Sequence, residues 1–462
     1  MTHPNTDAKP LNVLVMAAGL GTRMKSRRAK VLHELAGRPL IAHVVRTAAS
    51  LEPQRIYVVV GHQAEEVEKA AIAEVGELAA AVLQAQQRGT GDAVQSARAQ
   101  LENSDSLLLV LSGDVPLIKA ETLQKLIEHH RASGAACTIL SVHLENPTGY
   151  GRIIRDAHGN FQHIVEQKDA TEEERQVREI NSGIYCFETA DLFAALHRVE
   201  PKNQQGEYYL TDVAEIIRAS GRKVEVFIHN DARELSGINT RAELAEFENL
   251  IRRNAIRRLM TESGVTFIDP AHAYVSPDAQ VGRDSIIYPD VTIEGATVIG
   301  EGCVIRSGAR ITNSRLGDEV VIKDHSIIVD SEIASNCAVG PFAHLRMNAA
   351  LEEKATVGNF VEVKKSRLKR GTKAMHLSYL GDATIGERTN IGAGTVTCNY
   401  DGVRKHETVI EDDVKIGSDT MLVAPVRVGS RSVTGAGSVV TKDVPPDSLV
   451  AGVPAQVKKK LK

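Results

Sequence analysis

A turn near the start of this chain combines small residues with cations in a way that suits phosphate chemistry. It follows an apolar run and reads Met16-Ala17-Ala18-Gly19-Leu20-Gly21-Thr22-Arg23-Met24, with Lys30 shortly after it. Glycine and alanine let backbone N–H groups approach a phosphate closely, and Arg23 and Lys30 can offset its charge. The pattern is not a GxxxxGK[ST] loop, and Met24 stands where a dinucleotide fingerprint needs glycine. Alone, this turn favours phosphate binding and a plain tight turn equally.

Two further turns strengthen the phosphate interpretation. The apolar run 107–111 ends in Ser112-Gly113-Asp114, which predicts a carboxylate at the carboxyl end of a strand, where a phosphate-bound cation would lie. An aspartate in an ordinary turn is the alternative. The segment 84–91 begins at Gln84, contains Gly89 and Thr90, and precedes a helix expected near Asp92. It could present amide groups to a nucleobase.

His376 is the candidate for a second kind of chemistry. A single histidine is more often structural than catalytic, and the chain has 16 of them. A neutral imidazole is nevertheless the usual general base near neutral pH, and an amine that attacks a thioester must lose a proton. His376, with Tyr379 nearby, falls where a sequence repeat is expected to be interrupted, in residues 366–379, and such interruptions often carry function.

That repeat has a period of six residues and fills most of the chain after residue 280. A period of six fits neither an α-helix nor an amphipathic strand, but it fits a parallel β-helix with inward aliphatic residues. Small or β-branched residues follow four positions after the first five members, at Ser285, Val291, Thr297, Cys303 and Ala309. A second interruption is expected in residues 398–409. Such a solenoid has no deep cleft of its own, so we expect its chemistry between neighbouring chains. The aliphatic members are Val281, Ile287, Ile293, Ile299, Ile305, Ile311, Ile333, Val339, Leu345, Leu351, Val357, Val363, Ile385, Ile391, Ile410, Ile416, Leu422 and Val428.

The first half of the chain alternates strand-like and helix-like segments. Strands are predicted at 13–16, 56–60 and 107–111, and helices at 65–81 and 121–132. This order predicts a mostly parallel sheet with helices on both faces and ligands beyond the carboxyl ends of the strands. A charged amphipathic helix over 241–262 would join this domain, 1–240, to the repeat domain, 263–462.

Bulk composition narrows the class of protein. The net charge of −4 gives no basic footprint for nucleic acid, and the apolar stretch 11–20 is too short to insert in a membrane. Five scattered cysteines without a CxxC pair argue against disulfides and a zinc site, and they favour the cytoplasm.

Together, these segments resemble the sugar-nucleotide pyrophosphorylases, whose signature is a GxGTRM loop followed by a lysine. The likeness extends through residues 149–152, 164–166, 179–183, 206–209 and 237–239. With the hexads, the chain from about residue 13 to 450 resembles the bacterial bifunctional N-acetylglucosamine-1-phosphate uridyltransferase/glucosamine-1-phosphate acetyltransferases. The resemblance implies a Rossmann-like α/β nucleotidyltransferase domain, a left-handed parallel β-helix, and a homotrimer. It also implies the synthesis of UDP-N-acetylglucosamine for peptidoglycan and lipopolysaccharide.

In the first domain the resemblance implies uridylyl transfer from UTP to N-acetylglucosamine 1-phosphate. Asp114 and Asn239 would hold Mg²⁺, while Arg23 and Lys30 steady the triphosphate. Ala29 stands where the family usually has proline. The nucleotide would contact Met16, Ala17, Ala18, Gly19, Gln84, Gly89, Thr90, Ser112 and Gly113, and the sugar would contact Gly151, Glu166 and Asn181.

In the second domain the resemblance makes His376 the base that deprotonates glucosamine 1-phosphate as it attacks acetyl-CoA. The sugar phosphate would contact Arg346, Lys364, Tyr379 and Asn390, and acetyl-CoA would contact Ala393, Asn399, Tyr400, Ser418 and Ala436. Around Arg346, His344 and Met347-Asn348 depart from the family pattern. Gly452 stands where the family has an arginine that helps to hold coenzyme A, and Lys458, Lys459 and Lys460 could replace its charge.

Two alternative functions remain to be weighed. One is a monofunctional pyrophosphorylase whose β-helix only assembles the oligomer; His376, Tyr379 and Asn399-Tyr400 argue against it, since a spacer does not need them. The other is a scaffold with two inactive sites, which would not need to keep Asp114 and Lys30. Small molecules, not nucleic acid or membrane, are the expected partners.

Overall fold

The computed structural model describes residues 9–460, so both outer ends of the predicted domain ranges lie outside it. The chain forms two compact units, the first ending at Phe247 and the second beginning at Glu248. The division falls within helix α9 (Arg241–Glu262). Each unit has its own core of buried aliphatic residues.

The first unit is built on a nine-stranded sheet in which β11-β7-β10-β6-β1-β4-β5 are successive neighbours. β1 runs parallel to β4 and β6, and β10 runs antiparallel to β6 and β7, which confirms a mostly parallel sheet. A separate two-stranded sheet contains β2 (Glu34–Leu35) and β3 (Arg38–Pro39). The strands of the main sheet are β1 (Leu11–Met16), β4 (Arg55–Val60), β5 (Ala79–Leu83), β6 (Leu107–Ser112), β7 (Cys137–His143), β8 (Arg152–Arg155), β9 (Phe161–Val165), β10 (Glu179–Glu188) and β11 (Val224–His229).

Helices cover both faces of this sheet because successive residues of a strand point to opposite sides. Val13 and Val15 of β1 share a core with α1 (Leu40–Ala49), α2 (Ala64–Val75) and α5 (Ala120–Ser133). Leu14 shares the opposite core with α3 (Thr90–Gln95), α4 (Arg98–Leu101), α7 (Thr189–Leu196) and α8 (Thr211–Ala219). The remaining short elements are α6 (Glu172–Arg175), η1 (Thr22–Met24), η2 (Lys30–Leu32) and η3 (Gly76–Leu78).

Two helix boundaries differ from the sequence prediction. The helix predicted over 65–81 ends at Val75, and residues 79–81 belong to β5, which pairs in parallel with β4. Alanine has a high helix propensity, so Ala79, Ala80 and Ala81 favour a helix locally, but pairing with β4 decides their conformation. Helix α3 begins at Thr90, two residues before the expected start.

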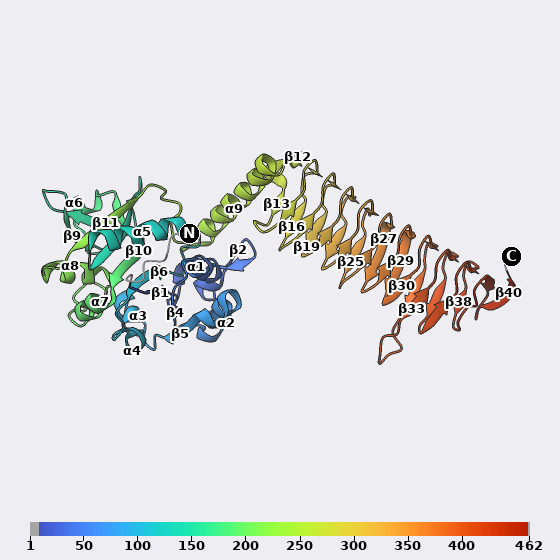
Figure 1. Cartoon of the computed structure of the whole chain (residues 1–462), viewed down its shortest axis with the longest axis horizontal. Coiled ribbons are helices and arrows are strands. Elements are labelled where there is room, and N and C mark those ends of the chain that lie inside the picture. Colours follow the sequence, from blue (N-terminus) through green and yellow to red (C-terminus); the bar gives the residue numbers. More distant parts are fainter. Residues whose placement is uncertain (1–8, 461–462) are drawn as a thin grey trace. The chain divides into compact units, whose positions relative to one another are not determined.

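The second unit is a parallel β-helix whose strands stack coil upon coil (Figure 1). Val281 pairs with Ile299 and Ile287 with Ile305, one coil of 18 residues later. The aliphatic residues of the predicted hexads are all buried in one continuous core, which confirms the predicted architecture, and the repeat is consistent with the left-handed form.

The strands of the β-helix are short. One sheet contains β12 (Thr266–Phe267), β13 (Tyr274–Val275), β15 (Ile286–Ile287), β16 (Thr292–Glu294), β18 (Val304–Ile305), β19 (Arg310–Thr312), β21 (Val321–Ile322), β22 (Ile327–Val329), β24 (Ala338–Val339), β25 (His344–Arg346), β27 (Thr356–Lys364), β29 (Lys373–Gly381), β31 (Asn390–Ile391), β32 (Val396–Cys398), β34 (Lys415–Ile416), β35 (Met421–Val423), β37 (Val433–Thr434), β38 (Val439–Val440), β39 (Ser448–Ala451) and β40 (Gln456–Lys460). The other contains β14 (Gln280–Val281), β17 (Val298–Ile299), β20 (Arg315–Leu316), β23 (Glu332–Ile333), β26 (Ala350–Leu351), β28 (Arg367–Leu368), β30 (Ala383–Ile385), β33 (Thr408–Ile410) and β36 (Val426–Val428), and η4 (Pro270–His272) lies near the start of the unit.

The interruption predicted at residues 366–379 is wrong. Leu351 pairs with Leu368, Val357 with Ala374, and Val363 with Leu380, so the coils continue in register through this segment. The hexad count failed because the step from Val363 to Leu368 has five residues and because Ala374 takes an inward position with a small side chain. His376 therefore lies within β29, in register with the preceding coil, and not in a loop.

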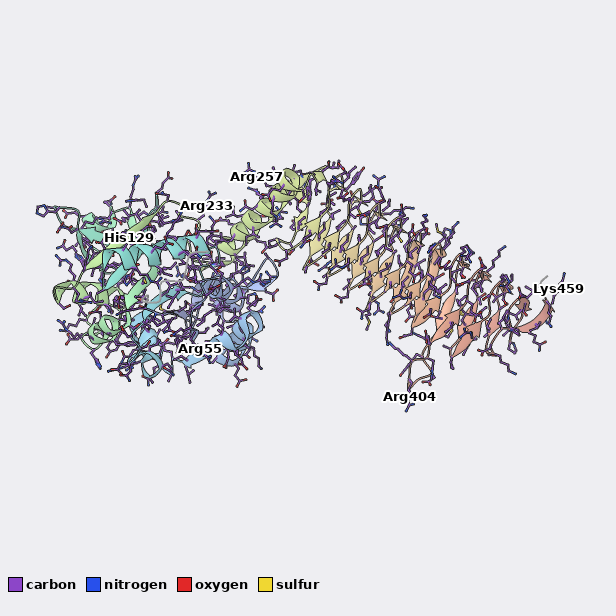
Figure 2. The ribbon with its side chains drawn as sticks, in the orientation of Figure 1. Arg55, His129, Arg233, Arg257, Arg404 and Lys459 are labelled. Carbon is purple, nitrogen blue, oxygen red and sulfur yellow. The ribbon has the colours of Figure 1, made fainter. Side chains whose placement is uncertain are left out.

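The second predicted interruption is confirmed. Ile385 pairs with Ile410, 25 positions later, because a loop of residues 399–407 is inserted between β32 and β33. Figure 2 shows Arg404 of this loop away from the stacked coils. Within residues 9–460, no helix has both the length and the apolar character needed to cross a membrane.

The buried His130 makes the first unit sensitive to acid. Its side chain is 1% exposed, its Nδ1 lies 2.8 Å from Thr138 Oγ1, and its Nε2 has no hydrogen-bond partner in the part of the chain that the structure describes. Burial lowers the pKa of His130 to about 4, with further lowering by Arg131 and His129, and Glu188 opposes this shift. Below the ordinary pKa of histidine, His130 binds a proton in the unfolded chain but stays neutral in the folded protein. Stability is therefore lost as the pH falls from about 6.5 to about 4.

We predict that acid destabilises the protein less when His130 is replaced. Between pH 7 and 4.5, the wild-type chain should lose up to about 3 kcal/mol of stability more than His130→Gln, measured by denaturant unfolding of the first unit. The exposed His158, changed to Gln, is the control and should behave as wild type. Equal losses in wild type and His130→Gln would show that other groups cause the acid sensitivity.

Candidate active sites

The first candidate site forms where the loops after β1 and β6 meet. Lys30 Nζ pairs with Asp114 Oδ2 and donates to Asn239 Oδ1 at 3.0 Å. Arg23 Nη2 donates to the same Asn239 oxygen at 2.8 Å, and Ser112 Oγ donates to Asp114 Oδ1 at 2.6 Å. The structure therefore brings together the two predicted metal ligands and the two predicted triphosphate cations.

The start of helix α9 fixes Asn239. Glu243 Oε2 accepts from the backbone N–H of Asn239 at 2.7 Å and from that of Thr240 at 2.9 Å. Thr240 Oγ1 accepts in return from the backbone N–H of Glu243 at 3.2 Å, which completes a capping box. Because Asn239 immediately precedes this box, its backbone position is set by the helix.

The donor set at this site fits Mg²⁺. Burial alone would raise the pKa of Asp114, but the Lys30 ammonium and the Ser112 hydroxyl lower it overall, so the carboxylate stays charged. One carboxylate and one amide oxygen, completed by substrate phosphates and water, are typical ligands of Mg²⁺. No group of three or more His, Cys, Asp or Glu side chains arranged for a metal occurs in the described part of the chain, so a cage of protein ligands alone is not available.

A cavity of about 410 Å³ adjoins this cluster. Its far wall is the turn 84–91, which the segment 207–210 holds in place. Gly91 N donates to Tyr208 O at 2.7 Å, and Leu210 N donates to Thr90 Oγ1 at 3.0 Å. Gln84 Nε2 donates to Asp92 Oδ2 at 2.8 Å. The predicted nucleotide residues Met16, Ala17, Ala18, Gly19, Lys30, Gln84, Gly89, Thr90, Ser112 and Asp114 all line this cavity, together with Glu207, and Gly113 N donates to Met16 O at 2.9 Å beneath it.

The three predicted sugar contacts form a group of their own. Asn181 N donates to Gly151 O at 2.9 Å, and a β-carbon on Gly151 would lie 3.2 Å from Glu166 Oε1. Glu166 lines a neighbouring cavity of about 290 Å³ with Asp169, Thr211 and Asp212. Burial and nearby carboxylates raise the pKa of Glu166, and the same causes raise that of Asp212 to about 6.

Thr211 was missed by the sequence analysis. It is 5% exposed, lines the Glu166 cavity, and its hydroxyl has no hydrogen-bond partner among the described residues 9–460. It stands two residues after the Gly206-Glu207-Tyr208-Tyr209 motif, but only the folded chain places it beside Glu166.

In the second unit, His376 lies at one corner of the β-helix. Its Nδ1 is 2.8 Å from Asn359 Oδ1 on the preceding coil, with which it is in register. An amide oxygen only accepts, so Nδ1 carries the proton and Nε2 of the neutral ring is free to accept one. The backbone links His376 to the coils that follow: Gly394 N donates to Leu377 O, Asp419 N to Ala393 O, and Gly437 N to Ser418 O. The predicted base thus shares one corner column with the predicted acetyl-CoA residues Ala393, Ser418 and Ala436.

Arg346, Lys364 and Tyr379 lie together on the side that follows this corner. Arg346 and Lys364 are register partners on successive coils, and Arg346 Nε donates to Glu362 Oε1 at 2.8 Å. Asn399 Nδ2 donates to Asp382 Oδ2 at 2.6 Å and lies 3.5 Å from Tyr379 OH. These residues form one polar cluster at the far edge of the side, roughly 13 Å along the strand from the His376 corner.

Two predicted contacts lie apart from this polar cluster within one chain. Asn390 pairs with Lys373 and Lys415 on the side that precedes the His376 corner. Tyr400 is 61% exposed, and its hydroxyl donates to Gly402 O at 2.6 Å within the inserted loop.

Lys405 of the inserted loop also belongs to the polar cluster. No motif in the sequence indicated Lys405 as a candidate. The Lys405 ammonium beside Lys364, together with burial, lowers the pKa of Lys364. Lys364 Nζ lies 3.9 Å from Asp382 Oδ2. The neighbouring ammonium groups of Lys364 and Lys405 repel each other, so an anion bound between them would be stabilised.

The carboxyl end folds back on the last coil. Gly452 has a φ of +107°, a conformation that favours glycine, and its carbonyl accepts from Val439 N at 3.1 Å. β40 pairs antiparallel with β39, and it carries the exposed Lys458, Lys459 and Lys460 (Figure 2, Lys459).

Comparison with known proteins agrees with this arrangement. Residues 13–182 match the MobA-like NTP transferase domain, residues 270–352 the GMPPB C-terminal domain, and residues 407–442 the bacterial transferase hexapeptide repeats. The bifunctional protein GlmU of Heliobacterium modesticaldum is 50% identical over 436 residues, 94% of each chain. The bifunctional proteins GlmU of Syntrophomonas wolfei, 48% identical over 95% of this chain and 96% of the relative, and of Geobacillus sp. strain WCH70, 46% identical over 96% of each, are similar relatives.

The chain belongs to the GlmU family of bifunctional proteins. It is an enzyme with a nucleotidyltransferase unit and a hexapeptide-repeat acetyltransferase unit, as predicted. The resemblance to the uridyltransferase/acetyltransferases is confirmed.

We predict that Gly89→Ala disturbs the wall of the nucleotide cavity. Gly89 has a φ of +110°, and an added β-carbon would lie 2.5 Å from Tyr208 O. Gly159, at a φ of +84° with no atom within 4 Å of an added β-carbon, is a matched control that carries only the backbone strain. Gly89→Ala should lower stability by about 1–3 kcal/mol more than Gly159→Ala in denaturant unfolding. Equal losses of stability in the two variants would mean that segment 207–210 moves away from the added β-carbon without a cost in free energy.

Proposed function

We propose that this enzyme makes UDP-N-acetylglucosamine in two steps at two separate sites. The second unit transfers an acetyl group from acetyl-CoA to glucosamine 1-phosphate. The first unit then transfers a uridylyl group from UTP to N-acetylglucosamine 1-phosphate and releases pyrophosphate. The observation that carries this proposal is the pair of distinct clusters, Asp114–Lys30–Asn239 on a sheet edge and the His376 column on a β-helix.

In uridylyl transfer, the chain's own residues hold the nucleotide and its charge. In the turn 16–19, the N–H of Ala17 already donates to Val59 O at 2.9 Å, so the N–H groups of Ala18 and Gly19 contact the phosphates. Lys30 and Arg23 neutralise the charge that develops on the leaving pyrophosphate. Mg²⁺ held by Asp114 and Asn239 supplies further neutralisation of the triphosphate. Gln84, Gly89 and Thr90 hold the nucleobase end.

The acidic cavity next to Gly151 suits a sugar. Carboxylates accept hydrogen bonds from sugar hydroxyls, and a hydroxyl can both accept and donate them, so these groups are good partners for a sugar. We assign Glu166 and Asn181 to the sugar, with Thr211 as an additional contact. Asp212 has a raised pKa of about 6, so it carries a proton below that pH.

In acetyl transfer, His376 Nε2 removes a proton from the attacking amine. The hydrogen bond to Asn359 supports this role because it holds the proton on Nδ1 and fixes the ring. Acetyl-CoA would extend along the corner column past Ala393, Ser418 and Ala436. The lysines of β40, beyond the end of this column, supply positive charge for its phosphates in place of an arginine at position 452.

Lys364, Lys405 and Arg346 together suit the phosphate of glucosamine 1-phosphate. Lys364 is 5% exposed and is crowded by a second ammonium group. A phosphate between these cations relieves their repulsion and accepts their hydrogen bonds.

One incubation tests the whole proposal. Purified protein is mixed with glucosamine 1-phosphate, acetyl-CoA, UTP and Mg²⁺, and UDP-N-acetylglucosamine is expected. A monofunctional pyrophosphorylase would form this product only when N-acetylglucosamine 1-phosphate is supplied, and an inactive scaffold would form none.

We predict that the two activities separate by mutation. Asp114→Ala should lower uridylyl transfer by at least 100-fold because the triphosphate loses its cation site, and acetyl transfer should continue at the wild-type rate. His376→Ala should have the opposite effect. Each half-reaction is measured separately, by pyrophosphate release and by free coenzyme A. Loss of both activities from either substitution in a folded protein would contradict two independent sites.

We also propose that the enzyme is a cytoplasmic homotrimer. The polar cluster around Lys364 and the His376 corner lie at opposite edges of one side, so a second chain is needed to enclose both substrates. Next to His376, Phe342, Phe360 and Leu377 form an exposed apolar ladder on successive coils, 48%, 56% and 61% exposed, with Phe342 stacked on Phe360 at 5.4 Å. Burial of such a ladder against another copy would remove it from water. The five unpaired cysteines suit the cytoplasm.

We predict that a charge in this ladder breaks the assembly. Phe360→Asp should convert trimers to smaller species in sedimentation velocity and abolish acetyl transfer, while uridylyl transfer is retained. Ile72→Asp, on the partly exposed face of α2, introduces the same charge elsewhere and should leave the trimer intact. A wild-type monomer that is fully active at micromolar concentration would contradict the proposal.

A further inference from the structure

Lys30 occupies the place between the two oxygens that the proposed metal would take. Its ammonium contacts Asp114 Oδ2 and lies 3.0 Å from Asn239 Oδ1. Mg²⁺ binds oxygen at 2.0–2.1 Å, so a metal ion bound to both oxygens would overlap the ammonium where it now lies. We propose that Lys30 acts as a built-in cation that excludes the divalent ion from the free enzyme until a triphosphate draws it away. This inference rests on the proposed metal role of Asp114.

Burial makes a counter-charge on Asp114 necessary. The side chains of Lys30 and Asp114 are 17% and 13% exposed. A carboxylate this buried is unstable without a positive partner, and Lys30 forms the only ion pair of Asp114 among residues 9–460. Before substrate binds, the positive charge of Lys30 therefore stabilises the Asp114 carboxylate, as the metal ion would do later.

The nucleotide offers Lys30 a better partner. Lys30 lines the same cavity as residues 16–19, where the triphosphate is proposed to bind. A triphosphate carries several negative charges, so it can attract the ammonium while its own divalent cation takes the freed oxygens. Arg23, which also bonds to Asn239 Oδ1, would be released at the same time. A cation therefore neutralises the Asp114 carboxylate both before and after the exchange.

The base of the lysine is held still during this exchange. Gly21 has a φ of +60°, and an added β-carbon there would lie 2.5 Å from the β-carbon of Lys30. The turn is therefore packed directly on the root of the side chain. Only the outer methylene groups need to rotate, which is a small movement for an unbranched chain.

The test measures Mn²⁺ binding to the full-length enzyme by electron paramagnetic resonance, in the absence and in the presence of UTP. Free wild-type enzyme should bind Mn²⁺ about tenfold more weakly than Lys30→Met, because the variant no longer holds an ammonium at the site. Lys25→Met removes an exposed lysine from the same turn and should bind as wild type does. Lys30→Arg keeps a cation and should also exclude Mn²⁺, which guards against a simple folding defect. Asp114→Asn in the Lys30→Met background should abolish the gain.

Two outcomes overturn the inference in different ways. If UTP promotes Asp114-dependent Mn²⁺ binding in the wild type but Lys30→Met binds Mn²⁺ no more tightly without UTP, the metal site stands and the exclusion by Lys30 does not. If Asp114→Asn leaves Mn²⁺ binding unchanged even with UTP, the proposed metal site itself is wrong and the inference fails with it.

Discussion

Parallel strand pairing in register is the constraint on which both halves of this enzyme depend. In the first unit, Met16 of β1 is paired with Ser112 of β6, so the loops that follow them leave the same edge of the sheet and bring Lys30 to Asp114. In the second unit, Asn359 is paired with His376 one coil later, and the same stacking continues to Ala393, Ser418 and Ala436. Residues far apart in sequence meet because parallel pairing aligns equivalent points of successive strands. Helical crossovers provide the alignment in one unit and solenoid coils in the other.

Buried charge is the second constraint, and it explains why each site contains more ionic groups than its chemistry alone needs. Asp114 stays ionised because Lys30 and Ser112 offset the cost of its burial. Lys364 is as buried, but its neighbours include Lys405 and Arg346 as well as Asp382, so positive charge is in excess. In the first site Asp114 is therefore already paired with a cation before substrate arrives, whereas Lys364 in the second site faces further cations. A paired carboxylate must exchange one cation for another when a metal ion binds, whereas crowded cations gain directly from an anionic substrate.

The fold and the separate motifs could be predicted from the sequence, but the sequence indicated little about which motifs lie close together in space. The six-residue period identified the β-helix because the inward orientation of each residue depends mainly on its own apolar side chain. It misjudged residues 366–379, since one five-residue side and the small Ala374 break the count while the backbone pairing continues. Motifs and the family resemblance selected Asp114, Lys30 and His376 as candidates. They could not find Asn359, Lys405 or Thr211, whose roles depend on contacts across coils or between distant loops. The helix expected over 65–81 failed for the same reason, because pairing with β4 overrides alanine's preference.

The start of α9 shows how a connecting element can also be part of a site. Its capping box uses one oxygen of Glu243 to hold the backbone N–H groups of both Asn239 and Thr240. A helix normally needs such a partner only to satisfy its own free N–H groups. Here the same carboxylate also fixes the residue whose side-chain oxygen faces Lys30 and Arg23. Fraying of the first turn of α9 would therefore release Asn239 before it affected any other part of the cluster. The geometry of the candidate nucleotidyltransferase site thus depends on a helix whose later residues belong to the other unit, so the first turn of α9 positions Asn239 as well as connecting the units.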